Sequence, residues 1–400
     1  SPQVVAPANP TVAAPTAANP DRQRVRDPND LTWEQFNASV LARRSEFKGI
    51  FVQEVVIDWK VQLHQRPQQL AEAMGRAGYL VLYRTGNHGD DNVEGFRQVA
   101  PNVWLTNSPE VANIPDTVRS IYSTASGQTA QGLYRTVPST LVYEYIDHID
   151  PQISGAPELI RRLVALKDYA FSGSVDYVVA SSKALYDEAV ERLGAERTLL
   201  VPNGVDCRHW RREVTAELPP EYRAFRSKYA RVVGYFGALA PWLWYELIHD
   251  VAHNQPDVGF VFIGPDYYGG VDRLPRLPNV LHIDAVDYKV LPAYAALFDV
   301  CFIPFALGDI ARSTSPLKLF EYFAMEKPVV VTSDLIECTQ YPEVFAGGTA
   351  AEVCAAMDRA FAVKDEPSFK RRLRDLADRN DWNARAAEFA RAFSRPGGAQ

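Results

Sequence analysis

The sequence predicts an α/β protein built from two Rossmann-like, doubly wound domains that face a central cleft. Segments typical of strands and helices alternate along the chain in two successive series, which predicts two parallel sheets in tandem. Several expected strands are apolar throughout, as in Val-Val-Val at 329–331, and this pattern is typical of strands covered by helices on both faces. Ligands bind at the carboxyl ends of such strands, so we expect a site in the cleft between the domains.

The composition is that of a globular protein, and it argues against several classes. The 400 residues are 47% hydrophobic, and the formal net charge of −7 argues against nucleic-acid binding through a generally basic surface. No run approaches the roughly 18 apolar residues of a transmembrane helix, so we expect no membrane span. Four widely spaced cysteines without a CxxC motif favour buried thiols, of which Cys301 and Cys354 lie in apolar segments. We therefore expect a cytoplasmic protein, with peripheral attachment to the inner face of the membrane as an alternative.

The first expected domain covers residues 31–213 and follows a proline-rich tail or linker over residues 1–30. A helix over 66–77 is expected because proline lies in its first turn and glycine follows its last. A helix up to residue 193 is expected because a serine caps its start and a glycine ends it. The other expected elements, in chain order, are strands over 50–57, 79–83, 103–105 and 141–146, a helix over 158–169, and strands over 177–180 and 199–201.

The second expected domain covers residues 214–379 and follows the turn Pro-Asn-Gly at 202–204. Its strands are short apolar runs that end at glycine, proline or a charged residue. The expected elements, in chain order, are a strand over 232–236, a helix over 243–253, strands over 260–263 and 280–283, a helix over 291–298, a strand over 300–304, a helix over 316–325, a strand over 328–331, and helices from 350 onward.

Several nucleotide and hydrolase motifs are missing from the chain. It contains no GxGxxG and no GxxxxGK[ST], which argues against ordinary dinucleotide and P-loop sites. It contains no HExxH and no GxSxG, which argues against zinc proteases and ordinary α/β-hydrolases.

The densest set of candidate site residues surrounds the helix that we expect to begin at Pro316. Ser315 suits the N-cap position, and proline suits the first helical position. The free N–H groups of this helix start, beside the hydroxyls of Ser313 and Thr314, predict an anion site. Lys318 and Glu321 lie three residues apart and share one helix face. A cation at this place suits a diphosphate and a carboxylate one turn deeper suits a ribose diol, while a surface Lys–Glu pair is the alternative.

The same segment resembles a known signature. Ser-Pro-Leu-Lys-Leu-Phe-Glu-Tyr-Phe-Ala-Met at 315–325 is similar to the donor-binding segment of GT-B glycosyltransferases of the retaining, sucrose-synthase-like group, in its bacterial polysaccharide or glycan type. Three further segments resemble that group in the same order: Gln-Arg-Pro-Gln-Gln-Leu-Ala at 65–71, Leu-Val-Pro-Asn-Gly-Val at 200–205, and Gly-Tyr-Phe-Gly-Ala-Leu from residue 234. The resemblance covers roughly residues 50–395.

The resemblance implies a metal-independent hexosyl transfer from a nucleotide-diphosphate sugar to an acceptor hydroxyl, in polysaccharide or glycan biosynthesis. It implies that the C-terminal domain binds the donor and the N-terminal domain a glycan or lipid-linked glycan, with a last helix at about 380–395 crossing back to the first domain. No cofactor is implied, and the chain contains no Asp-x-Asp metal motif. Glu321 would hold the ribose hydroxyls, and Lys318 would add positive charge at the diphosphate. The full donor set implied is Gly237, Arg312, Ser313, Thr314, Ser315, Pro316, Leu317, Lys318 and Glu321.

Two departures from the family pattern affect this donor set. The family often has a glutamate eight positions before the ribose-binding glutamate, and this chain has Ser313 there. The usual basic pair after the first strand of the C-terminal domain is also missing, because residues 237–245 contain no lysine or arginine. The identity of the donor sugar is therefore not predicted, and Arg312 or Lys318 is expected to supply the charge.

The first domain contributes further candidates. Asp147 and His148 follow a strand at its carboxyl end, where the family places a polar residue near the donor sugar, so they join Lys318 as catalytic candidates. A solvated turn or a buried Asp–His hydrogen bond is the alternative. Arg66 and Gln65 begin a helix after the first strand and are acceptor candidates, with a surface arginine as the alternative.

Three other functions share these sequence features. A GT-B epimerase or phosphorylase has the same fold, but its additional catalytic groups are not evident. A GT-B domain that binds a nucleotide or sugar without transferring it agrees with the missing glutamate and basic pair. A purely structural role would make the Ser-Pro, Lys318 and Glu321 pattern a coincidence.

Overall fold

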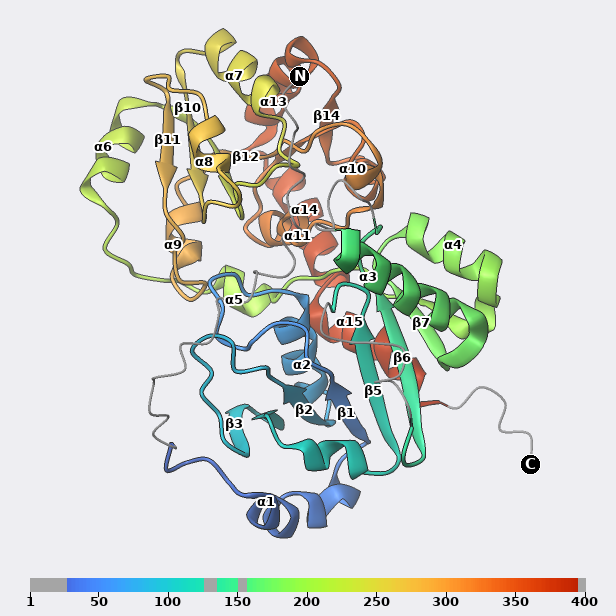
Figure 1. The fold of residues 1–400 in the computed structure, drawn as a ribbon. Coiled ribbons are helices and arrows are strands. Elements are labelled where there is room, and N and C mark those ends of the chain that lie inside the picture. Colours follow the sequence, from blue (N-terminus) through green and yellow to red (C-terminus); the bar gives the residue numbers. More distant parts are fainter. Residues whose placement is uncertain (1–26, 126–134, 150–156, 395–400) are drawn as a thin grey trace. The chain divides into compact units, whose positions relative to one another are not determined.

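The computed structural model describes residues 27–125, 135–149 and 157–394, and these divide into two compact units. Unit 1 comprises Ser1–Pro202 and Trp382–Gln400, and unit 2 comprises Asn203–Asp381 (Figure 1). The sequence placed the boundary after residue 213. It lies earlier because helix α5 (Cys207–Arg211) packs against helices of unit 2. Of the tail expected over residues 1–30, only residues 27–30 are described, and there Asp30 is buried and paired with Arg97.

The sheet of unit 1 has eight strands in the order β3-β4-β2-β1-β5-β6-β7-β8, and only the β3–β4 pair is antiparallel. The chain runs from β1 toward one edge and then from β5 toward the other, so its topological switch point lies between β1 and β5. The strands are β1 (Ile50–Gln53), β2 (Leu80–Arg84), β3 (Phe96–Ala100), β4 (Val103–Thr106), β5 (Thr117–Tyr122), β6 (Ser139–Tyr145), β7 (Tyr177–Ala180) and β8 (Thr198–Leu200).

Helices cover the sheet of unit 1. Phe36 of α1 packs on Ile50 and Val52 of β1, while the Phe51 ring lies 5.0 Å from that of Phe389 in α15. The last helix thus belongs to unit 1, and Trp382 at its start is fully buried. The helices are α1 (Trp33–Ser39), α2 (Arg66–Arg76), α3 (Pro157–Tyr169), α4 (Lys183–Leu193) and α15 (Trp382–Phe389), with short turns η1 (Leu41–Glu46), η2 (Pro109–Asn113), η4 (Ala170–Ser174), η5 (Ala195–Arg197) and η6 (Ala390–Phe393).

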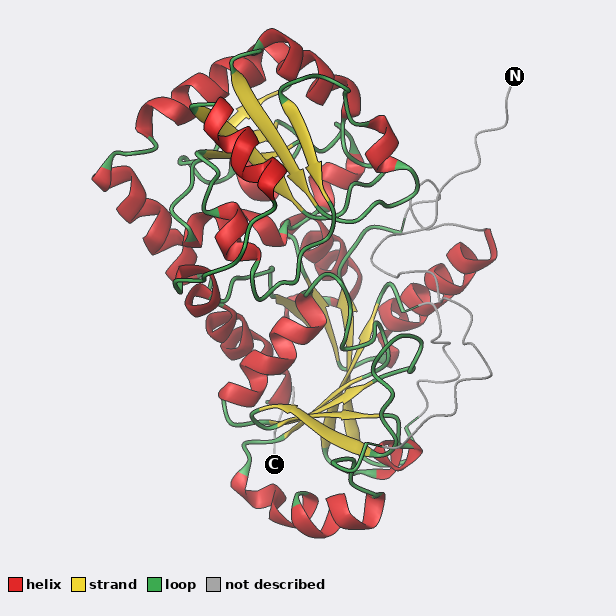
Figure 2. Ribbon diagram, turned by 90° about the vertical axis from the view of Figure 1, so that its left-hand side faces the viewer, coloured by secondary structure: helices red, strands yellow, loops and turns green. Residues whose placement is uncertain are grey.

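The sheet of unit 2 has six parallel strands in the order β11-β10-β9-β12-β13-β14, so its switch point lies between β9 and β12. Helices flank this sheet on both faces (Figure 2). The strands are β9 (Arg231–Phe236), β10 (Val258–Ile263), β11 (Val280–Ile283), β12 (Val300–Ile303), β13 (Val329–Thr332) and β14 (Phe345–Gly347). The helices after α5 are α6 (Pro220–Lys228), α7 (Tyr245–Asn254), α8 (Gly270–Arg273), α9 (Leu291–Ala295), α10 (Asp309–Ser313), α11 (Leu317–Ala324), α12 (Ile336–Thr339), α13 (Ala350–Val363) and α14 (Pro367–Arg379).

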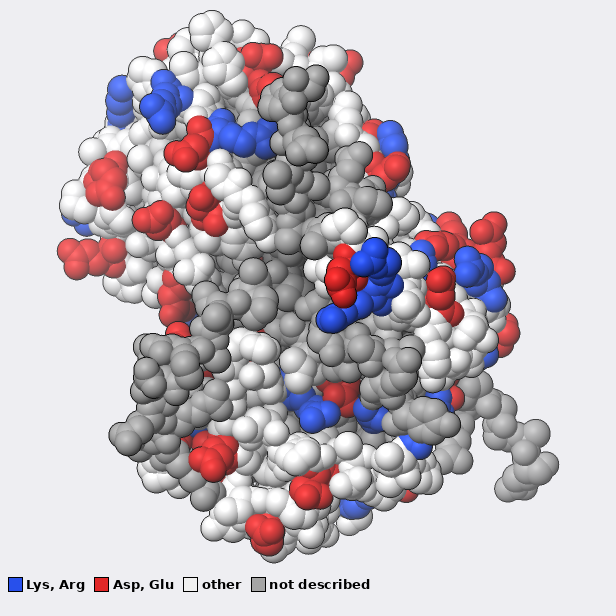
Figure 3. All heavy atoms as spheres, in the orientation of Figure 1, with Lys and Arg blue, Asp and Glu red and all other residues white. Residues whose placement is uncertain are grey.

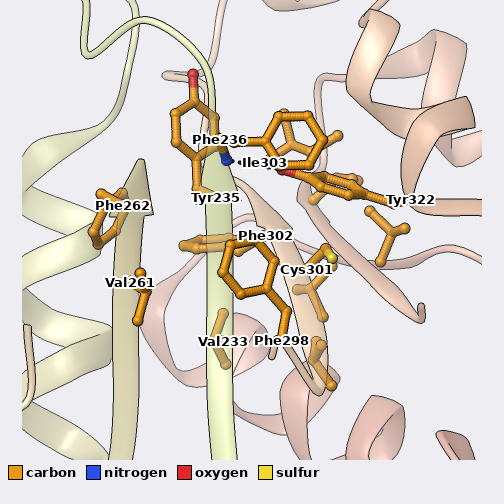
Figure 4. Close-up of a cluster of buried hydrophobic side chains, with 14 of the residues drawn as sticks. Val233, Tyr235, Phe236, Val261, Phe262, Phe298, Cys301, Phe302, Ile303 and Tyr322 are labelled. Atoms are coloured by element: carbon orange, nitrogen blue, oxygen red, sulfur yellow. Dashed lines mark hydrogen bonds between the residues drawn. The ribbon is translucent and has the colours of Figure 1, made fainter. Parts of the chain in front are cut away.

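The core of unit 2 is continuous beneath this switch point. Phe298 lies across the middle of β9, beside side chains of β10 and β12 (Figure 4). A Cβ atom at Gly234 would lie 2.1 Å from the Phe298 ring, so only glycine fits there. This packing holds β9 and β12 side by side where Val300 pairs with Val233 and Cys301 with Gly234.

The prediction of two doubly wound α/β units is confirmed, with three strands missed. The sequence pattern does not predict strands β3, β5 and β14. Strand β5 escaped because its polar residues Arg119 and Ser120 break the apolar pattern, although both are buried. Cys301 is fully buried and Cys354 is half-buried, and both are free thiols. Among the described helices, none has the length and apolar content needed to cross a membrane.

Candidate functional site

A candidate site lies at the switch point of unit 2, where β9 and β12 end. Gly237 follows β9 with φ +135°, a conformation that favours glycine. A Cβ atom here would lie 3.0 Å from Lys318 Cε and 3.4 Å from Lys318 Nζ. The missing side chain therefore makes room for the lysine of α11 to cross the end of β9.

The start of α11 differs from the predicted cap. The helix begins at Leu317, with Pro316 rather than Ser315 in the N-cap position, and the described residues supply no side-chain cap. Ser315 is occupied elsewhere: its hydroxyl oxygen accepts the Asn203 N–H at 3.3 Å, and its carbonyl accepts Asn203 Nδ2 at 2.6 Å. The prediction of a Ser315 cap is therefore wrong, because the buried Asn203 binds this serine. The helix start is left as a potential anion site.

Lys318 places a positive charge at this helix start. Its Nζ lies 5.3 Å from the ring centroid of Tyr235 and 5.7 Å from that of Phe305, so it contacts aromatic faces. Within the described part of the chain, no hydrogen bond or ion pair engages this ammonium. Burial lowers the pKa of Lys318, and the charge of Glu321 opposes that shift. A cation so placed is available to an anionic ligand.

Glu321 lies one turn deeper and is buried, with only 7% of its surface exposed. Burial raises the pKa of Glu321 to about 7, while Lys318 and the indole of Trp210 lower it. That indole makes no hydrogen bond within ordinary geometric limits to any described residue, although it lies near the carboxyl group. Among described residues, the Glu321 carboxylate also has no such partner and no ion pair. The alternative of a surface Lys–Glu pair is therefore wrong.

Two aromatic contacts fix α11 against the end of β9. The Phe236 N–H donates a hydrogen bond to the Tyr322 hydroxyl at 3.2 Å (Figure 4). The Phe236 ring stacks on Trp210 of α5 at 5.0 Å and contacts the ring of Tyr322 at 4.8 Å. These contacts hold Lys318 and Glu321 in place without using their charged groups, so the site is preorganised.

The other predicted donor residues make local contacts. The Ser313 hydroxyl donates to the carbonyl of Asp309 at 2.8 Å, and the Thr314 hydroxyl donates to that of Ile310 at 2.6 Å. Arg312 forms ion pairs with Asp309 at 3.0 Å and with Asp334 at 2.8 Å. These residues border the site, but both hydroxyls donate to local carbonyls and the Arg312 charge is balanced by Asp309 and Asp334, which leaves Lys318 as the cation without an ion pair.

In unit 1, the predicted acceptor residues lie at the start of α2. Arg66 is 3% exposed; its Nε donates to Glu144 at 3.0 Å, and its Nη1 donates to the carbonyl of Val201 at 2.8 Å. The alternative of a surface arginine is therefore wrong. Gln65 is half-buried, and its N–H donates to Gln68 at 3.2 Å. Contact of Arg66 and Gln65 with an acceptor stays a prediction.

Asp147 and His148 follow β6, and both are half-buried. The pKa of Glu188 is lowered, against the effect of burial, mainly by hydrogen bonds from Lys167 and Tyr145, and His148 adds a smaller effect in the same direction. The Asp147 charge adds to the effects that raise the pKa of Tyr145, of which burial is the largest. Both candidates therefore face other ionisable groups of unit 1, and their catalytic role stays a prediction.

In the described ranges, no three His, Cys, Asp or Glu side chains gather closely enough to hold a metal ion. Metal independence of the reaction stays a prediction, because a metal can arrive with its substrate.

Comparisons with known proteins give a curated relative and many solved structures, and no family model matches. The putative teichuronic acid biosynthesis glycosyltransferase TuaH of Bacillus subtilis is 28% identical over 256 residues, which cover 61% of this chain and 64% of the relative. Less than two thirds of that relative is therefore matched.

Among the solved structures that match most of the chain are two that contain UDP or UDP-2-fluoro glucose. Anabaena HepE in complex with UDP and glucose superposes with a TM-score of 0.61 at 16% identity, over 86% of this chain and 99% of HepE. The E. coli trehalose-6-phosphate structure bound with UDP-2-fluoro glucose gives 0.61 at 13% identity, over 87% and 99% of the two chains. The chain has the GT-B fold.

Three residues around the GT-B site were missed by sequence reasoning. Trp210 faces Glu321 from α5, Asn203 binds Ser315, and Tyr322 fixes α11 on β9. The Pro-Asn-Gly turn marked Asn203 in the sequence, but nothing in the sequence indicated that Asn203 binds Ser315, which lies 112 residues away. No sequence pattern around Trp210 indicated its contact with Glu321, because that contact depends on the packing of α5.

Proposed function

We propose that this chain is a glycosyltransferase that moves a sugar from a nucleotide-diphosphate sugar to an acceptor hydroxyl. The observation that carries the proposal is Glu321, a buried carboxylate that lies near the Trp210 indole and has no ion-pair partner among the described residues, one turn from Lys318, whose ammonium makes no hydrogen bond or ion pair there. A buried carboxylate is normally paired with a charged group, so Glu321 without an ion pair, beside the unengaged ammonium of Lys318 at a switch point, indicates a ligand that pairs both.

A nucleotide-diphosphate sugar supplies the matching groups. Its ribose diol donates to Glu321, and its diphosphate accepts from Lys318 and from the uncapped start of α11. As the glycosidic bond breaks, negative charge grows on the leaving diphosphate, and these fixed donors stabilise it. UDP is the nucleotide we propose first, because the matching HepE structure contains UDP and glucose.

The finer features of the proposal rest on the resemblance and the curated relative. We propose transfer with retention and without a metal, with unit 1 binding a glycan or lipid-linked glycan. Asp147 and His148 are the unit 1 candidates for contact with the transferred sugar. TuaH is named for teichuronic acid biosynthesis, which supports a role in a bacterial polysaccharide. We propose a cytoplasmic location, or one at the inner face of the membrane.

A second function, binding without transfer, also has support. Arg312 is engaged by Asp309 and Asp334, and the Ser313 hydroxyl by a carbonyl. The donor sugar therefore meets fewer free groups than the family pattern provides. Such a module would keep the nucleotide-binding features of Lys318 and Glu321 and lose turnover.

The test begins with thermal-shift measurements on nucleotides and nucleotide sugars. We expect stabilisation by a uridine, adenosine or guanosine diphosphate, lost in Glu321→Gln and kept in Glu326→Gln, whose carboxylate pairs with Arg374 outside the site. Release of the nucleoside diphosphate from the best nucleotide sugar then distinguishes a transferase from a binding module. Absence of any nucleotide binding would overturn both functions.

A further inference from the structure

Unit 1 contains a charged cluster at the carboxyl ends of its central strands. Glu54 follows β1, Arg84 ends β2, and Arg119 lies within β5. The register pairs Gln53 with Tyr83 and with Ser120, so the next residue, Glu54, lies beside Arg84 and diagonally opposite Arg119. The cluster thus lies next to the switch point between β1 and β5, where a doubly wound sheet binds ligands.

Two arginines share one carboxylate in this cluster. Arg84 Nη1 donates to Glu54 Oε2 at 2.8 Å, and Arg119 Nε donates to Glu54 Oε1 at 2.9 Å. Glu54 is 3% exposed and Arg119 is 8% exposed, while the Arg84 side chain is 22% exposed. A single carboxylate neutralises one guanidinium, so the cluster retains one positive charge near the edge of the sheet.

The remaining N–H groups of these arginines are not used. Arg84 Nε is buried and has no hydrogen-bond partner among the described residues. Over the same residues, neither Arg84 Nη2 nor the two Nη atoms of Arg119 make a hydrogen bond. Basic and acidic side chains lie side by side on the visible surface of unit 1 (Figure 3). Burying unpaired donors is costly, and two adjacent guanidinium groups fit the oxygens of a carboxylate or phosphate.

We infer that Arg84 and Arg119 bind an oxyanion carried by the sugar acceptor, either a carboxylate or a phosphate group. The inference rests on the proposed function, because it identifies the substrate class of the unit that would hold the acceptor. The anion neutralises the extra positive charge and accepts from the unused N–H groups. Glu54 holds both guanidinium groups in position and is a positioning residue.

Calorimetric titration with three sugars tests the inference: glucuronate, glucose 6-phosphate and uncharged glucose. Arg84→Gln and Arg119→Gln each leave Glu54 paired with the other arginine, so the fold should persist. Arg76→Gln is the matched control, since it removes the same charge from the last turn of α2, where Arg76 Nε donates to Asn383. Lys318→Ala tests whether the anion binds at the donor site of unit 2 instead, because binding there would be weakened by this substitution.

We expect an anionic sugar to bind the wild type, Arg76→Gln and Lys318→Ala alike, and glucose to bind more weakly. Affinity should fall roughly tenfold or more in both Arg84→Gln and Arg119→Gln, the loss expected of a charge-assisted hydrogen bond. Arg119→Lys keeps the charge without the planar guanidinium group, so its affinity for the anionic sugar should lie between that of Arg119→Gln and that of the wild type. The anionic sugar that binds with the higher affinity, glucuronate or glucose 6-phosphate, identifies the anion as a carboxylate or a phosphate.

Three results would overturn the inference: no binding of either anionic sugar by the wild type, an affinity in both arginine variants equal to that of the wild type, or loss of binding in Lys318→Ala. The last result would leave the proposed function intact, because it would place the anion at the donor site. Conversely, failure of all nucleotides to bind would remove the proposed function while an arginine-dependent anion site remained. Circular dichroism of each variant verifies that it is folded.

Discussion

The substitution Glu321→Gln should stabilise the protein in the absence of ligand. In the folded state, burial raises the pKa of Glu321 from 4.5 to about 7, so ionisation costs the folded state more than the unfolded one. This penalty is absent at low pH and is fully present above pH 7. Glutamine never ionises, so the variant should avoid this penalty. The raised pKa of about 7 already contains the opposing effect of the Lys318 charge, so the penalty is the net cost of ionising Glu321.

The size of the effect follows from the shift. A rise from 4.5 to about 7 corresponds to about 3 kcal/mol of folding free energy above pH 7. For a unit of this size, each 1 kcal/mol changes Tm by roughly 2–4 °C, so Tm at pH 8 should rise by about 6–12 °C. At pH 4.5 and below, the two proteins should differ little. Differential scanning fluorimetry over this pH range measures the difference.

The same variant should lose ribonucleotide binding. Loss of a charged hydrogen bond to the diol should cost roughly 1–3 kcal/mol for ribonucleoside diphosphates and little for 2′,3′-dideoxy analogues. Glu326→Gln is the control, because its carboxylate is paired with Arg374 and should respond to neither test. A Tm at pH 8 no higher than that of the wild type would refute the burial argument. Equal loss of affinity for both nucleotide types would remove Glu321 as the ribose ligand.

Four further predictions concern the same site. Lys318→Ala should weaken nucleoside diphosphate binding roughly ten- to hundredfold without unfolding the protein, and calorimetry showing unchanged affinity would remove Lys318 from the site. Gly237→Ala should also weaken binding, because a Cβ atom 3.0 Å from Lys318 Cε displaces the lysine; an unchanged Kd contradicts this. Affinity for a nucleotide sugar should fall as pH decreases through 7, because Glu321 becomes protonated, and a flat calorimetric profile between pH 5.5 and 8.5 argues otherwise. Transfer should survive EDTA, since the helix start and Lys318 hold the diphosphate, and a loss that Mg²⁺ reverses contradicts metal independence.

The sequence by itself determined the fold class and the helix that carries the site. Strand and helix periodicity, with caps and breakers, depends on residues close together in the chain, so both sheets were predictable. The three-residue spacing of Lys318 and Glu321 placed them on one face of α11 for the same local reason. Strand β5 was missed because the buried charge of Arg119 is stabilised by Glu54, a partner that no local pattern reveals.

Only the tertiary structure decided how these residues are used. Ser315 satisfies every local rule for a helix cap, yet Asn203, 112 residues away, binds it instead. The pKa of Glu321 depends on burial beneath α5 and on Trp210, which no spacing on α11 encodes. Arg66 likewise forms a buried ion pair with Glu144, and the sequence did not reveal this pair because Glu144 lies in a strand far along the chain. Burial and charge pairing are set by segments far apart in the chain, and these set the chemistry of a site that local sequence only locates.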